Sequence, residues 1–288
     1  MKRKWGDRRD AVLLKKIDSM HFIMPLIMPN RCDNEAFIND CLDLTEVMKY
    51  LEKKNAANPE YKYNVFQVLV AAVLKTITLR PHLNRFIKND NLYQRNEVTA
   101  AFTVKKVFSD SGDEALARVH AKKTDTLETV HNEIYRQLTF LRKDDGKDSS
   151  TQSMDMLQHI PQFLKKGLGI GVRFLDNHGW MPSSLIETDP FQSSVVLANL
   201  GSIKLKAGYH HLTNWGTTSL FCVMGEIKDR PFRNEDGTEE LRPSVEIGLT
   251  VDERISDGYY CSRSIALLKE LMAHPEYLDL PFGQKVSF

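Results

Sequence analysis

Two adjacent histidines, His210 and His211, are well suited to move a proton near neutral pH, because the imidazole pKa lies close to that range. They stand in the stretch AGYHHLTNWG. If this stretch is extended, adjacent side chains point to opposite faces, so only one histidine can enter a given site. The alternative interpretation is a turn histidine beside a core histidine that is bonded to the backbone. A metal site made from this pair and Glu253 is disfavoured, since adjacent histidines seldom share one ion.

Helix and strand patterns follow one another along the chain in an order that predicts an α/β fold, with a mixed central sheet flanked by helices. From Ser193 onward, three apolar runs separated by glycines and polar turns indicate neighbouring strands of this sheet. The other segments predict a strand and helix over 37–54, a buried helix over 64–81, a strand or hairpin over 91–108, and helices over 124–142 and 262–273. We interpret the polar run over 143–151 as a surface loop.

The composition of the 288 residues is that of an ordinary globular protein, with 42% hydrophobic and 27% charged residues. The formal net charge of +1 gives no large field to attract nucleic acid or an anionic membrane, so we expect neither partner. No apolar run has signal-peptide or membrane-spanning length, which predicts a cytoplasmic protein. The four cysteines lack the close pairs that a zinc site needs, and no metal is expected.

Three collinear stretches resemble the catalytic domain of the dihydrolipoyl acyltransferases of 2-oxoacid dehydrogenase complexes, and so the wider chloramphenicol acetyltransferase-like superfamily. They are LRPHLNRFIKNDNLYQRNEV, VVLANLGSI followed by SLFCVMGEI, and LTVDERISDGYYCSRSIALLKELMAHPEYL. The resemblance covers most of the chain. It implies the coenzyme A-dependent acyltransferase fold as one catalytic domain over 1–288, with an extension over 1–35 and without lipoyl or peripheral-subunit-binding domains. It also implies a homotrimer with active sites between subunits.

The resemblance implies a site in which two family positions are changed. Glu253 stands where the family has its catalytic histidine, and Ala198 stands where the family has a serine or threonine that supports the oxyanion. Asp257 and Gly258 match the end of the family motif, and Gly258, Asn199 and Ala198 mark the coenzyme A-binding positions. The family pairs its aspartate with a basic residue, for which the candidates here are Arg8, Arg9, Lys15 and Arg31.

Two hypotheses follow from these substitutions. In the first, the chain moves an acyl group from acyl-coenzyme A to a small hydroxyl, amine or thiol acceptor. His210 or His211 then supplies the base, with Glu253 orienting or replacing it. A carboxylate with its ordinary pKa of about 4.3 is a weak base unless burial raises that pKa. In the second, the chain is an inactive member that keeps the trimer for binding or scaffolding, and Glu253 is a solvated or salt-bridged carboxylate.

Overall fold

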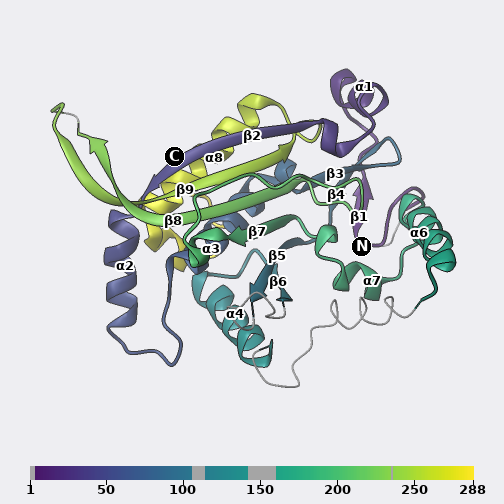
Figure 1. Ribbon diagram of the computed structural model, residues 1–288. Helices are drawn as coiled ribbons and strands as arrows, with labels where there is room; N and C mark the ends of the chain where they lie inside the picture. The colour runs from purple at the N-terminus through teal and green to yellow at the C-terminus, as the bar shows by residue number, and fades with distance from the viewer. Residues whose placement is uncertain (1–3, 106–113, 142–159, 235) are drawn as a thin grey trace.

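A computed structural model describes residues 4–105, 114–141, 160–234 and 236–288. Its centre is a six-stranded mixed sheet with the strand order β2-β9-β8-β7-β5-β6, as Figure 1 shows. The strands are β2 Glu35–Asp43, β5 Val98–Lys105, β6 Glu114–Ala121, β7 Val195–Asn199, β8 Leu220–Arg233 and β9 Glu239–Asp252. Strands β5, β7 and β8 are parallel to one another, and the other pairs are antiparallel. The predicted α/β class and the three neighbouring strands after Ser193 are confirmed.

A second, three-stranded sheet has the order β1-β4-β3. Its strands are β1 Ala11–Leu13, β3 Arg85–Lys88 and β4 Asn91–Arg95. Of the two alternatives for 91–108, a strand or a hairpin, the hairpin is wrong, because β4 and β5 belong to different sheets. The hairpin is β3–β4, and its turn residues Asn89 and Asp90 adopt left-handed conformations with φ of 48° and 59°. Turns of this kind match the twist of paired strands and favour asparagine and aspartate.

The helices α2, α3, α4 and α8 gather behind one face of the large sheet, and the main core lies between them and the sheet. Helix α3 is buried along most of its length, as predicted, and begins with a capping box between Asn64 and Gln67. The helices are α1 Ser19–Ile27, α2 Thr45–Asn55, α3 Val65–Leu79, α4 Leu127–Leu141, α6 Gln162–Asn177, α7 Ser183–Thr188 and α8 Gly258–Ala273. The short 3₁₀ helices are η1 Arg31–Asp33, η2 Pro81–Asn84, η3 Pro190–Gln192, η4 Leu200–Ile203 and η5 Pro275–Asp279.

The opposite face of the sheet is crossed by residues 204–217, which we call the crossing segment. It lies so close that two strand positions admit only glycine. A Cβ at Gly225 would stand 2.4 Å from the Ala207 nitrogen, and a Cβ at Gly248 would stand 2.1 Å from the Gly208 carbonyl oxygen. The crossing segment therefore holds both predicted histidines against the sheet.

Two further findings concern the sequence expectations. The polar run over 143–151 lies outside the described residues. Within the parts of the chain that are described, no helix is long and apolar enough to cross a membrane, and no group of three or more histidine, cysteine or acidic side chains could hold a metal ion.

Candidate active site

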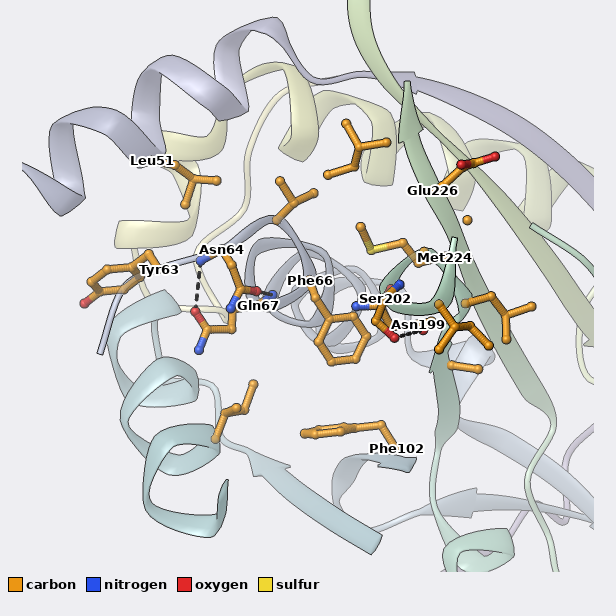
Figure 2. A pocket seen from close by; sticks show the side chains of 18 of the residues that line it. Leu51, Tyr63, Asn64, Phe66, Gln67, Phe102, Asn199, Ser202, Met224 and Glu226 are labelled. Atoms are coloured by element: carbon orange, nitrogen blue, oxygen red, sulfur yellow. Dashed lines mark hydrogen bonds between the residues drawn. The ribbon is translucent and has the colours of Figure 1, made fainter. Parts of the chain in front are cut away.

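A cavity of about 1300 Å³ opens beside the carboxyl ends of the parallel strands β5 and β7 and the middle of β8. Ligands of α/β proteins commonly bind at such strand ends. Ala198 and Asn199, two of the predicted coenzyme A-binding positions, line this cavity. Phe66 of α3 stands between Asn199 on one side and Gln67 on the other, above Phe102 of β5 (Figure 2).

Asn199 and Gly201, which follow Ala198, have local structural roles that explain why asparagine and glycine occupy these positions. Asn199 caps η4, because its side-chain oxygen accepts a hydrogen bond of 3.2 Å from the Ser202 amide. Gly201 passes so close to β8 that a Cβ would stand 2.3 Å from the Gly225 carbonyl oxygen. Ala198 itself presents only a methyl group, which cannot donate a hydrogen bond to an oxyanion.

Helices α2, α3 and α4 provide the far wall of the cavity, which the sequence did not predict. The Gln67 side-chain oxygen accepts from the Asn64 amide and faces His131 Nδ1 at 3.2 Å. The Gln67 amide nitrogen is buried without a partner among the described residues, and Gln67 lines the cavity. The sequence signal was the pair Asn64 and Gln67 at capping-box spacing, which predicts a helix start but says nothing about a cavity.

The loop that carries Glu253 is fixed by its two neighbours. Asp252 and Arg254 are both buried and form two contacts of 2.8 Å, from the guanidinium Nε and Nη2 to separate carboxylate oxygens. Arg31 approaches the same carboxylate at 3.6 Å. Glu253 is exposed, and in the described part of the chain its carboxylate makes no hydrogen bond or ion pair. The Arg254 guanidinium is therefore paired with Asp252.

Asp257 and Gly258 begin α8. The Asp257 carboxylate accepts a hydrogen bond of 2.7 Å from the Tyr260 amide and so caps the helix. None of the four basic candidates is placed as its ion-pair partner: Arg8 pairs with Asp10 and Asp176, and Arg31 pairs with Asp252. Gly258 has helical conformation, and a Cβ there would meet no atom within 4 Å. Local backbone geometry therefore does not require this glycine.

The two histidines point to different strands, as expected for an extended segment. The His210 ring lies 4.7 Å from the Phe221 ring of β8. Partial burial and the neighbouring His211 lower the pKa of His210. His210 thus has an apolar neighbour and no acidic partner among the described residues.

His211 has the surroundings of an oriented base. Its Nδ1 lies 2.7 Å from Glu35 Oε2, and the Glu35 side chain is only 4% exposed whereas that of His211 is 81% exposed. The other Glu35 oxygen accepts a short hydrogen bond from the Leu212 amide. With Nδ1 held by the carboxylate, Nε2 of His211 is left toward solvent. Glu35, and not Glu253, is the carboxylate that contacts His211.

Strand register separates the predicted site residues into two groups. Glu35 pairs with Asp252, so His211 and the Glu253 loop lie at the same end of the sheet. Ala198 pairs with Val223, which in turn pairs with Gly248, at the cavity end. Glu253 follows five residues after Gly248, which corresponds to about 16 Å along the strand direction. Within one chain, the Ala198 group and the His211 group do not share one site.

Solved structures with the same arrangement of elements cover nearly the whole chain. The probable dihydrolipoamide acetyltransferase of Listeria monocytogenes is 13% identical and superposes with a TM-score of 0.58, covering 93% of this chain and 95% of that one. The dihydrolipoamide acetyltransferase of Azotobacter vinelandii is 14% identical, with a TM-score of 0.60 and coverages of 92% and 93%. A chloramphenicol acetyltransferase is 11% identical, with a TM-score of 0.55 and coverages of 91% and 99%.

The chain has the chloramphenicol acetyltransferase-like fold. The fold that the sequence resemblance implied is therefore confirmed. No protein-family model and no curated protein matches the sequence. At this level of identity, the likeness to the chloramphenicol acetyltransferase-like structures concerns the fold alone.

Proposed function

We propose that this chain is a cytoplasmic, homotrimeric acyltransferase that moves an acyl group from acyl-coenzyme A to a small hydroxyl, amine or thiol acceptor. The observation that carries the proposal is the buried Glu35 carboxylate that orients His211 beside the Glu253 loop. Catalytic bases of this kind are held in position by a third group. Here His211 is the base and Glu35 is the group that orients it. His210 lacks such a partner.

In this proposal, His211 Nε2 accepts the proton of the acceptor as the acceptor attacks the thioester carbonyl carbon. The carbon–sulfur bond then breaks, and the same nitrogen returns the proton to the departing thiolate, so that protons and charge balance. Coenzyme A supplies the activated acyl group, and Asn199, Ala198 and Gly258 line its proposed path. The backbone at Gly258 does not require a glycine, and no atom of the chain fills the space beside it. A glycine at such a position suits the close approach of a ligand.

We include a trimer in the proposal because the Ala198 group and the His211 group lie at different ends of the sheet within one chain. Ala198 opens on the large cavity, and His211 lies at the other end of the sheet. A second subunit that sets its cavity end against this His211 end would assemble a complete site. The resemblance implies this arrangement between subunits.

The substitution at Ala198 sets an expectation for the rate. Removing one donor to an oxyanion typically costs about a hundredfold to a thousandfold in kcat. We therefore expect slow turnover that Ala198→Ser increases. Asp257 acts in this scheme as the cap that holds α8, and Glu253 adds charge at the rim of the site.

Titration of coenzyme A and acetyl-coenzyme A into the purified protein tests the proposal without knowledge of the acceptor. We expect micromolar binding in the calorimeter and a trimer by sedimentation equilibrium. Absence of binding at millimolar ligand would contradict the proposal. Ala198→Trp, which adds an indole to the lining of the cavity, should abolish binding, whereas Leu241→Trp on the β8–β9 hairpin serves as a control.

The second candidate function is a catalytically silent trimer that binds or scaffolds. The joint presence of Glu253 and Ala198 at the two catalytic positions favours it. In that case Glu253→His combined with Ala198→Ser should create acetyl-coenzyme A turnover where the unaltered chain has none. Turnover by the unaltered chain that depends on His211 would exclude the silent function.

A further inference from the structure

Helix α6 stands at the edge of the molecule, and among the described residues it is anchored near its carboxyl end. Among its residues 163–177, whose exposure is described, Asp176 alone is buried. Asp176 accepts a hydrogen bond of 2.8 Å from Arg8 and pairs with Lys88 of β3. The three turns that precede Asp176 extend away from the sheet at the right of Figure 1. The described contacts therefore anchor α6 at Asp176 and leave most of its residues exposed.

One face of α6 is apolar and open to solvent. Phe163, Gly167, Ile170 and Phe174 recur at helical spacing and share this face, which we call the α6 apolar face. Phe163 is 78% exposed and Ile170 is 70% exposed. A soluble helix normally turns such a face toward the core, and exposed apolar surface of this kind marks an interaction site.

Aromatic side chains extend this surface past the end of the helix. The Phe174 ring lies 4.2 Å from His178 and 6.0 Å from Trp180, and Trp180 is itself exposed. Tryptophan and histidine combine an apolar ring with a polar nitrogen, so they suit a boundary between apolar and aqueous surroundings.

The charges on α6 indicate what covers the apolar face. Lys165, Lys166 and Arg173 are exposed on one side of the helix. The exposed Leu164 and Leu168 lie between the α6 apolar face and Lys165, so they widen the apolar surface on the other side. The acidic residue of the helix, Asp176, is neutralised by its buried pairs with Arg8 and Lys88. The outer part of α6 is therefore locally cationic, even though the whole chain has a formal net charge of only +1.

An amphipathic helix with phenylalanine and leucine on one face and lysine and arginine on the other suits the interface of an anionic bilayer. We propose that α6 is a membrane-surface helix, which lies in the headgroup region of anionic lipids with its apolar face toward the acyl chains. A second copy of this chain would bring the same cationic residues together, so self-association through α6 is disfavoured. The sequence-based expectation of no membrane partner considered net charge and not this local distribution.

Vesicle sedimentation with the full chain tests the proposal. Vesicles of phosphatidylcholine with one lipid in four replaced by phosphatidylglycerol should bind the protein, and pure phosphatidylcholine vesicles should bind it much less. Ile170→Glu should lower binding at least about tenfold, because it places a charge in the apolar face. Leu241 is also 70% exposed but lies on the β8–β9 hairpin, so Leu241→Glu is the matched control and should bind like the unaltered chain.

A second pair of variants tests the role of charge. Lys165→Glu with Lys166→Glu should weaken binding to anionic vesicles, whereas Lys122→Glu with Lys123→Glu, outside α6, should have little effect. Added salt should weaken binding because it screens exposed charges. Circular dichroism and unchanged coenzyme A binding would show that the variants are folded.

Three results would overturn the proposal: no binding of the unaltered chain to anionic vesicles, equal binding by Ile170→Glu, or an equal loss with Leu241→Glu. Sedimentation velocity without lipid provides a further test. If the unaltered chain forms larger species than Ile170→Glu, a second copy covers the apolar face and the membrane assignment is wrong.

Discussion

The substitution Glu35→Gln gives a sharp test of the proposed base, because it changes a proton position without changing shape. The Glu35 carboxylate can only accept, so it requires the proton of His211 on Nδ1 and leaves Nε2 free when the ring is neutral. In the variant, the Leu212 amide still needs an acceptor, so the glutamine oxygen stays with it. The glutamine NH₂ group then faces Nδ1, which must accept, and the ring proton moves to Nε2.

A histidine with its proton on Nε2 cannot take a proton from the acceptor. We therefore expect Glu35→Gln to lower kcat by about a hundredfold to ten-thousandfold, the range of general base catalysis. Thiol release from acetyl-coenzyme A in the presence of thiol, amine and hydroxyl acceptors measures this effect. Long-range ¹⁵N–¹H spectra report the tautomer of His211 independently of turnover.

The two measurements separate the possible errors in this reasoning. If the tautomer changes and kcat stays within a factor of about two, His211 is not the base. If the tautomer does not change, the assigned hydrogen bonds of Glu35 are wrong. His210→Ala serves as the control, because His210 contacts Phe221 and not a carboxylate, and it should leave kcat nearly unchanged.

Three further predictions concern stability. Arg254→Met leaves a buried carboxylate without its bidentate partner and should lower the free energy of unfolding in urea by about 3–5 kcal/mol, whereas exposed Arg233→Met should change it by less than about 0.5 kcal/mol. Gly248→Ala places a methyl group 2.1 Å from a carbonyl oxygen of the crossing segment and should lower the melting temperature. Gly258→Ala meets no atom within 4 Å and should leave the melting temperature unchanged, but it should weaken coenzyme A binding. Burial lowers the pKa of His82 from 6.5 to about 4, so below pH 6.5 the unfolded chain binds a proton that the folded chain does not. Stability should therefore fall as pH drops from 6.5 toward 4 in urea titrations, and His82→Phe should reduce this dependence.

The helices and the central strands could be predicted because their signals are local. Asn64 and Gln67 mark the start of α3 at capping-box spacing, and the apolar run that follows gives its length. Over 91–108 the sequence favoured a strand or a hairpin, and the hairpin alternative failed because both segments have similar strand composition although they join different sheets. Which sheet a strand joins is decided by pairing across the chain, and the Asn89–Asp90 turn that settles it comes before the segment where the hairpin was expected.

The candidate site could be predicted only in part, because its decisive contacts join distant segments. His211 was found from its residue type, but Glu35, its partner, lies 176 positions earlier in the chain. Arg31 and Asp252 also meet only through the sheet register. The positions taken from the resemblance were placed at strand ends and helix starts, and register then showed that Ala198 and Glu253 belong to different ends of one sheet.

The Glu253 loop has a consequence for how such a protein can change over evolution. The shape of the loop depends on the buried pair formed by Asp252 and Arg254. The Glu253 side chain between them is solvent-exposed and makes no hydrogen bond or ion pair with the described residues. Residue 253 can therefore be exchanged without a cost in folding. A substitution at this position therefore alters the charge at the surface of the loop and leaves the scaffold that holds it unchanged.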